Sequence, residues 1–209
     1  MKILLTSSGL FIPKFLPAIV KKPIEQAKIG WVTTASKGVE DLTYLGQHRD
    51  MMNELGWNFE EIDIDGKSQA ELRKLFSDKD VVHVEGGNTN YLLMAIRKTG
   101  FAQIIKELIE RGVIYVGSSA GSYIMCPTIE MATWKKDNKP RYGLKDLTGL
   151  NYVPFLLFAH YKPEYDEILK KALKNIKYPL KIITDKQAIL VDDKKVELLG
   201  EGEEIKLNL

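Results

Sequence analysis

The chain has 209 residues, 44% of them hydrophobic, and 30 lysines and arginines against 28 aspartates and glutamates give a net charge of +2. This length and composition predict one domain over residues 1–209 with a full core, and they exclude disordered and fibrous classes. The near-neutral charge argues against a nucleic-acid partner, and a single cysteine excludes a disulfide framework or a multi-thiolate zinc site. The apolar stretches are too short for a signal peptide or a membrane span, so we expect a cytoplasmic protein with no membrane partner.

Apolar runs with strand character alternate with stretches of helical periodicity along most of the chain. Up to residue 116 we expect strands at 3–5, 29–33, 59–64, 81–84 and 113–116, and helices at 39–55, 68–76, 88–100 and 104–109. Beyond an irregular segment at 133–148 we expect a strand-like run at 155–159, a helix at 165–176 and short strands at 182–183, 188–191, 196–199 and 205–207. This alternation predicts a mostly parallel sheet with helices on both faces.

The segment Gly117–Gly121 reads Gly-Ser-Ser-Ala-Gly and fits the nucleophile elbow pattern G-x-S-x-G, with Ser119 at its centre. An apolar strand precedes it and a helix-compatible segment follows it, which is the context that the pattern requires. Glycine at both ends allows a sharp turn from strand to helix, and the serine Oγ then projects from the carboxyl end of the strand. The other reading is a glycine-rich turn that cradles phosphate.

A serine nucleophile needs a general base, which is usually histidine, and the chain has three histidines. His48 falls on a predicted helix, where we expect a surface or boundary role. His83 falls inside a predicted strand, as a buried, hydrogen-bonded histidine. His160 ends a strand-like run and follows Ser119 in the chain, as the order serine, acid, histidine requires. His160 is therefore the predicted base.

A second glycine-rich turn, Gly86-Gly87, closes one predicted strand and opens a helix. Two adjacent glycines let a substrate carbonyl approach the backbone, so this turn, together with the Ala120 N–H, predicts an oxyanion hole. Asn88 is suited to cap the helix that follows. We also place Glu85, Gly86 and Asn88 at the substrate site. For Glu85 a local cap or pair is the favoured role, and binding of a substrate ammonium group is the alternative.

Together these segments resemble peptidase E, the aspartyl dipeptidase family of serine peptidases, with cyanophycinase as a more distant relative. The resemblance covers most of the chain, through residues 1–5, 84–89, 117–122, 127–129, 153–155 and 160–161. It implies a class I glutamine amidotransferase-like fold, a flavodoxin-like three-layer α/β/α sandwich, with serine in place of cysteine. It also implies a Ser–His–acid triad that cleaves small peptides, with Ser119 as nucleophile, His160 as base, and Gly87 and Ala120 as oxyanion donors.

The chain departs from the family pattern at two places. Peptidase E carries its triad aspartate about fifteen residues beyond the serine, where this chain has Trp134. Cyanophycinase-like members use a glutamate a few residues later, which points to Asp137, with Glu130 as the alternative acid. The family's aspartyl specificity depends on an arginine after the histidine, but residues 161–175 contain none, so strict Asp-Xaa specificity is not expected unless Arg141 compensates.

These observations predict a serine peptidase that needs no metal and no organic cofactor. One alternative is an esterase of the α/β-hydrolase type, although the chain is short and lacks the three-glycine motif of that class. A glutamine amidotransferase subunit is disfavoured because the elbow carries serine, and Cys126 reads as a core thiol. The non-enzyme alternative is a catalytically impaired binding scaffold of the same fold. The sequence does not fix an oligomeric state, and a homodimer is one option.

Overall fold

The computed structural model describes residues 1–135 and 142–207. Its strands are β1 (Lys2–Thr6), β2 (Ile29–Val32), β3 (Phe59–Ile62), β4 (Val81–Val84), β5 (Ile114–Ser118), β6 (Leu156–Phe158), β7 (Leu180–Ile182), β8 (Gln187–Asp192) and β9 (Lys195–Gly200). Its α-helices are α1 (Leu16–Ile19), α2 (Thr43–Glu54), α3 (Gln69–Leu75), α4 (Thr89–Thr99), α5 (Phe101–Glu110), α6 (Ala120–Tyr123) and α7 (Asp166–Leu173). Short 3₁₀ segments connect several of them. No helix within these residues is long and apolar enough to cross a membrane.

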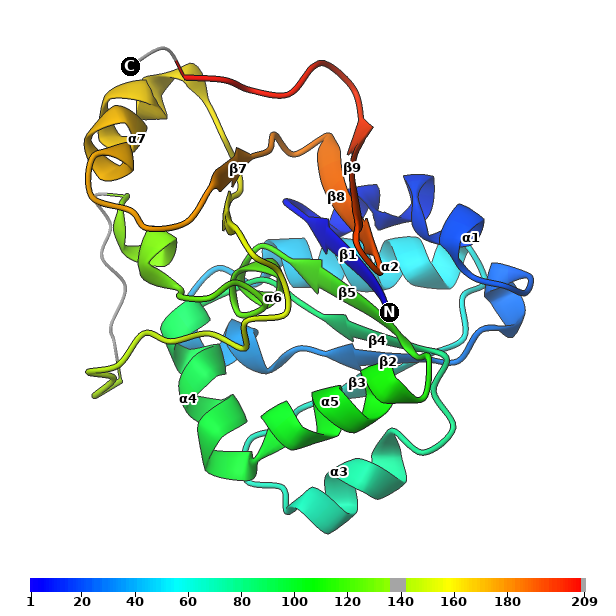
Figure 1. Ribbon diagram of the computed structural model, residues 1–209. Coiled ribbons are helices and arrows are strands. Elements are labelled where there is room, and N and C mark those ends of the chain that lie inside the picture. The colour runs from blue at the N-terminus through cyan, green and yellow to red at the C-terminus, as the bar shows by residue number, and fades with distance from the viewer. Residues whose placement is uncertain (136–141, 208–209) are drawn as a thin grey trace.

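Seven strands form the central sheet in the order β3-β2-β4-β5-β1-β8-β9 (Figure 1). The first five run parallel, and β8 and β9 add an antiparallel edge. Strands β1, β2, β4 and β5 are almost wholly buried, which is why they read as continuous apolar runs, whereas the edge strand β3 exposes Glu60 and Glu61. The carboxyl ends of β4 and β5 meet at one edge of the sheet and carry the two glycine-rich turns.

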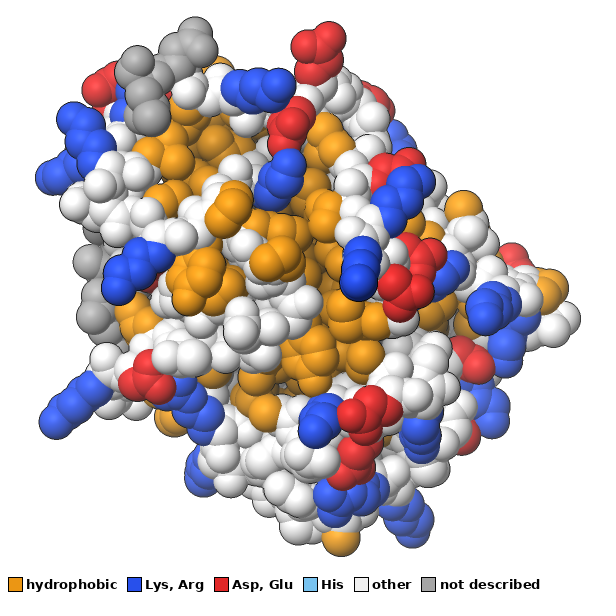
Figure 2. Space-filling view, in the orientation of Figure 1, with side chains coloured by type: hydrophobic (Ala, Val, Ile, Leu, Met, Phe, Trp, Pro, Cys, Tyr) orange, Lys and Arg blue, Asp and Glu red, His pale blue; other side chains and the backbone are white. Residues whose placement is uncertain are grey.

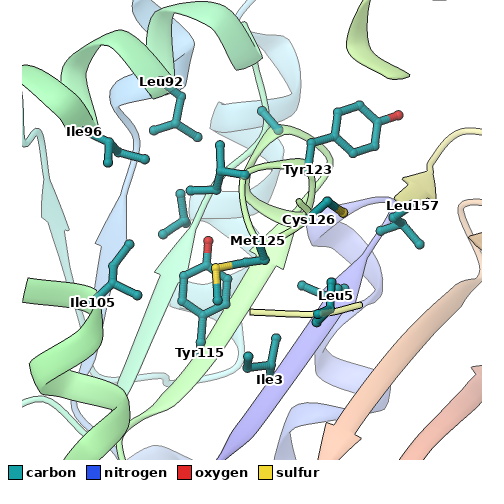
Figure 3. Packing of buried hydrophobic residues seen from close by; sticks show 14 of the residues in the cluster. Ile3, Leu5, Leu92, Ile96, Ile105, Tyr115, Tyr123, Met125, Cys126 and Leu157 are labelled. Carbon is teal, nitrogen blue, oxygen red and sulfur yellow. The ribbon is translucent and has the colours of Figure 1, made fainter. Parts of the chain in front are cut away.

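Helices cover both faces of the sheet, so the molecule has the three layers that the sequence predicts. Apolar side chains of α1 and α2 pack on one face, around Trp31. Those of α3, α4, α5 and α6 pack on the other. Figure 3 shows part of this second core, where Leu92 and Ile96 of α4 and Ile105 of α5 point toward Tyr115 of β5.

Strands β6 and β7 pair in parallel as a separate small sheet, with Phe158 opposite Ile182. Helix α7 packs beside them through Leu169. Apolar side chains gather across the middle of this face of the molecule, and charged side chains surround them (Figure 2). The small sheet matters for the site because its carboxyl-terminal loops lie near the end of β1.

Several boundaries differ from the sequence expectation. Helix α2 begins at Thr43 and not at residue 39, because the Asp41 carboxylate accepts the Thr43 N–H at 2.9 Å and forms a local turn before the helix. Helix α7 is confined to 166–173. Residues 205–207 form no strand. The segment just before them is bound by a side chain and not by strand pairing, because Gln187 Nε2 donates to the Glu203 carbonyl at 3.1 Å.

Candidate active site

Ser119 lies at the bend between β5 and α6, where the glycine spacing predicts a sharp turn. Its backbone has φ 46° and ψ −102°, a conformation that residues other than glycine rarely adopt. A Cβ on Gly121 would lie 2.0 Å from the Val84 carbonyl oxygen, and one on Gly117 would lie 2.6 Å from the Gly121 backbone. Both glycines are therefore required by the close approach of α6 to β4 and β5, which holds the bend.

His160 lies two residues after β6 and lines the same cavity as Ser119. This cavity has a volume of about 270 Å³, and its lining also includes Gly87, Asn90, Tyr123 and Lys135. His160 has a positive φ of 57°. Its backbone N–H donates to Ser7 Oγ at 2.7 Å, which anchors the residue to the loop after β1. The fold thus brings the predicted nucleophile and the predicted base to one cavity.

Asp185 contacts His160, and no sequence motif points to it. Asp185 Oδ1 lies 2.6 Å from His160 Nδ1 and accepts the Ser7 hydroxyl at 2.7 Å. The contact follows from the small sheet: His160 comes two residues after β6 and Asp185 comes three residues after β7, its parallel neighbour. The sequence shows only that Asp185 is a polar residue just after a strand. Its contact with His160 depends on the pairing of β7 with β6.

The hydrogen bond from His160 is the main reason that the pKa of Asp185 falls to about 2. Partial burial opposes this shift, and the Ser7 hydrogen bond supports it. Asp185 is therefore ionised at neutral pH and presents a carboxylate to His160 Nδ1. An imidazole held in this way by Nδ1 has its other nitrogen, Nε2, free to face a reacting group.

The Gly86–Gly87 turn lies directly beside Ser119. A Cβ on Gly86 would approach the Ser119 Cβ to 3.3 Å. Gly87 has a φ of 137°, and a Cβ there would lie 2.4 Å from the Ala35 carbonyl oxygen, so glycine alone fits. Within the described parts of the chain, the N–H groups of Gly87 and Ala120 donate no hydrogen bond. Two backbone donors thus stand on either side of the elbow without an internal partner.

The family model of Peptidase family S51 matches residues 3–199. The chain belongs to this family. An uncharacterized peptidase of Pasteurella multocida is 32% identical over 180 residues, which cover 85% of this chain and 87% of that one. A peptidase E of a Nostoc species is 29% identical over 72% of this chain and 56% of its own length. Among solved structures, a Listeria monocytogenes protein described as a candidate peptidase E matches with a TM-score of 0.84 and 28% identity, over 96% of this chain and 98% of that one.

Membership of family S51 makes the chain a peptidase, a hydrolase of peptide bonds. It confirms the resemblance inferred from the ordered motifs. The match to the Listeria structure over nearly the whole of both chains also confirms the predicted mixed α/β fold with a mostly parallel sheet.

Of the acids that the resemblance indicates, the structure describes only Glu130. Asp137 lies outside the described residues, as does Arg141. Glu130 lines a different cavity, against α7. Trp134, at the family's aspartate position, stacks on Phe158 with ring centroids 6.2 Å apart. Its indole therefore belongs to the apolar packing around β6.

Two of the three residues expected to contact substrate are directed inward. Asn88 accepts the Tyr91 N–H at 3.0 Å and caps the start of α4, the capping role that the sequence predicts for it. Glu85 is only 2% exposed, and internal donors bind its carboxylate, so it has the local pairing favoured for it and does not face a substrate ammonium group. Gly86 alone of the three lies beside Ser119.

His48 is buried, with 1% exposure, and not at the surface or boundary position expected for it. Its position three residues after Leu45 and four before Met52 places it on the apolar face of α2, a signal that helical periodicity does contain. His83 is buried and hydrogen-bonded as predicted, with Nε2 3.0 Å from Ser118 Oγ. Burial lowers the pKa of His83 to about 3, which keeps its ring neutral.

His48, His83 and Glu85 form a cluster whose ligand-type atoms lie within 4.8 Å of one another, a geometry that could surround a metal ion. Hydrogen bonds engage His48 Nδ1, His83 Nε2 and the Glu85 carboxylate, whereas His48 Nε2 is buried without a hydrogen-bond partner among the described residues. Glu85 Oε2 accepts the Trp31 Nε1–H at 3.0 Å and a bond from His48, while His83 pairs with Ser118. Burial alone would raise the pKa of Glu85, but the bond from His48 and the neighbouring imidazoles lower it to about 2. We therefore assign the cluster a hydrogen-bonding role.

Cys126 is fully buried, as expected of a core thiol. Burial raises its pKa to about 12, so the sulfur stays protonated and unreactive at neutral pH. Cys126 is therefore not suited to act as a nucleophile.

Proposed function

We propose that this peptidase cleaves small peptides through an acyl-enzyme on Ser119, with His160 as the general base. One observation supports this most: Ser119 and His160 line one cavity while an ionised carboxylate engages His160 Nδ1. With the Nδ1 proton donated to Asp185, Nε2 carries the lone pair that accepts the Ser119 proton.

The reaction has two halves. As His160 Nε2 takes the Ser119 proton, Oγ bonds to the substrate carbonyl carbon, and the oxyanion receives hydrogen bonds from Gly87 and Ala120. His160 then gives the proton to the amine, the C–N bond breaks, and an ester to Ser119 remains. His160 next deprotonates a water molecule that attacks this ester, and the carboxylic acid and free Ser119 are released. Apart from the peptide and water, these steps use only side chains and backbone amides of the chain.

Asp185 is the proposed third member of the triad, in place of Asp137 or Glu130. The support is direct contact with His160 and with Ser7, which ties the acid and the base to one loop. A carboxylate here fixes the imidazole tautomer and stabilises the imidazolium that forms during reaction. Its position after β7 is compatible with a triad because geometry and not chain order defines one.

The cavity favours small substrates. Its volume of about 270 Å³ lies just below the range of about 300–1,000 Å³ typical of ligand pockets. Lys135 brings a positive charge to its wall, with Nζ 3.3 Å from the Ala159 carbonyl and over the rings of Phe158 and Tyr165. Lysine attracts an acidic side chain without forming the bidentate fork of arginine. We therefore propose cleavage of several short peptides, with at most a modest preference for an acidic residue.

Labelling with a fluorophosphonate tests the nucleophile. Wild-type protein should be modified at Ser119 and should hydrolyse members of a dipeptide library, while Ser119→Ala should do neither. The library compares acidic, neutral and basic first residues, and acyl esters serve as the competing substrate class. A folded wild type whose Ser119 resists the reagent would favour the binding-scaffold alternative, and turnover of esters without peptides would favour the esterase.

A further inference from the structure

Two side chains of α2 point at the Gly86–Gly87 turn from behind the candidate active site. Tyr44 and His48 are four residues apart and so share one face of the helix. Tyr44 reaches the turn directly, and His48 reaches it through Glu85. Neither residue lines the cavity that holds Ser119 and His160.

Tyr44 holds the peptide plane that carries the proposed oxyanion donor. Its hydroxyl donates to the Gly86 carbonyl at 3.1 Å, and that carbonyl belongs to the same peptide unit as the Gly87 N–H. Burial, with the negative charges of Glu85 and Asp41, raises the pKa of Tyr44, which keeps the hydroxyl protonated as a donor. An amide whose carbonyl accepts a hydrogen bond is polarised, and its N–H becomes a stronger donor.

Glu85 holds the preceding peptide. Its Oε1 accepts the Gly86 N–H at 2.8 Å, while Oε2 is fixed by Trp31 and His48. All these groups are buried, so water cannot replace a bond that is lost. The two peptides on either side of Gly86 are thus each held by a buried or half-buried side chain.

The same cluster also reaches the elbow. His83 lies 3.8 Å from Glu85 and pairs with Ser118, whose Oγ lies 3.1 Å from Thr6 Oγ1. The Thr6 carbonyl accepts the Ser119 N–H at 3.0 Å. One buried set of polar groups therefore holds the turn with the Gly87 N–H and the bend with the Ala120 N–H.

We propose that Tyr44 and His48 are positioning residues, which act through the Gly86 peptide and Glu85 to aim the Gly87 N–H at the developing oxyanion. The inference rests on the proposed function, because it needs an oxyanion beside Ser119. Loss of these contacts should lower kcat while KM stays nearly constant, because an oxyanion donor acts mainly in the transition state.

Three variants test the contacts. Tyr44→Phe removes one hydroxyl and should lower kcat roughly 10-fold, a fraction of the ~10²–10³ lost when an oxyanion donor is deleted outright. His48→Asn places an amide nitrogen near the position of Nδ1 and should keep kcat within about 3-fold of wild type, whereas His48→Leu should lose roughly 10-fold or more. The Asn and Leu pair separates the hydrogen bond from the packing of the side chain.

Exchange of the Gly86 N–H, which donates to Glu85 Oε1, reports on the turn without relying on turnover. Exchange should be faster in Tyr44→Phe and His48→Leu than in wild type and His48→Asn. Gly46→Ala on the same helix and Thr99→Val, which removes a buried hydroxyl elsewhere, serve as controls and should change neither kcat nor this exchange.

Equal kcat in His48→Asn and His48→Leu, or a change confined to KM, would overturn the inference. So would unchanged exchange at Gly86 in all three variants. If wild-type protein hydrolyses no peptide and Ser119 takes no label, the proposed function fails instead, and the exchange data still show whether α2 holds the turn.

Discussion

His160 and Asp185 are 25 residues apart in the chain, and in the proposed mechanism their contact has the most direct consequence for turnover. Asp185→Asn keeps the size of the side chain but removes its charge, so the imidazolium formed during catalysis loses its partner. We expect kcat to fall roughly 10²–10⁴-fold, as for other triad aspartates, with a smaller change in KM. Steady-state hydrolysis of the best library dipeptide measures this.

Two further substitutions compare Asp185 with the acids that the family resemblance indicates. Glu130→Gln and Asp137→Asn should each leave kcat within a few-fold of wild type. A large loss in Asp137→Asn beside a small loss in Asp185→Asn would show that the triad acid is Asp137.

The residues of the elbow could be predicted from the sequence because their constraint is local. Gly117 and Gly121 flank Ser119 at fixed spacing, and the atoms that exclude a Cβ belong to the bend itself or to the neighbouring strand. Asp185 could not be predicted in this way. Its role depends on β6 lying parallel to β7, and each strand has only three residues with no distinctive pattern.

At the scale of elements, α2 shows what periodicity reveals and what it leaves out. Leu45 and Met52 predict the helix and its buried face, and His48 falls on that face. The same pattern cannot show that Glu85 on β4 receives the imidazole, because β4 and α2 meet only in the folded chain. A polar residue on an apolar helix face therefore predicts a buried partner without naming it.

Gly46 lies inside α2, and a Cβ there would meet nothing within 4 Å. Alanine at this position loses less backbone entropy on folding than glycine, so Gly46→Ala should raise the free energy of unfolding by about 0.5–1 kcal/mol. Urea unfolding followed by circular dichroism measures the difference. Gly121→Ala is the opposite case, since its Cβ would collide with Val84, and it should destabilise the protein. A destabilised Gly46→Ala would show that α2 needs the flexibility of glycine.

At the scale of the whole molecule, the three layers and the five parallel strands could be predicted because strand-like apolar runs alternate with stretches of helical periodicity along the chain. The antiparallel edge of β8 and β9 and the separate pairing of β6 with β7 depend on which strands meet. That choice places the loop with Asp185 beside the loop with His160. The proposed catalytic geometry thus depends on the least predictable part of the topology.

Stability of the whole fold should depend on pH through His83. Its pKa is about 3 in the folded chain and about 6.5 when exposed, because burial disfavours the charged ring. As the pH falls below about 6.5, His83 becomes protonated in the unfolded chain but stays neutral in the folded chain. The free energy of unfolding therefore decreases until about pH 3. At about 1.4 kcal/mol per pKa unit the full effect is on the order of a few kcal/mol.

His83→Gln isolates this contribution, because the glutamine amide reaches Ser118 Oγ from the place of Nε2 and does not titrate. Urea unfolding of both proteins at pH 7, 5.5 and 4.5 should give a smaller loss of stability in the variant. The buried carboxylate of Glu85, with a pKa of about 2 against an ordinary 4.5, loses its stabilising effect only below this range. If the stability of wild type and variant falls equally with pH, His83 is protonated in the folded state. The buried cluster of His48, His83 and Glu85 would then hold a charged His83 ring.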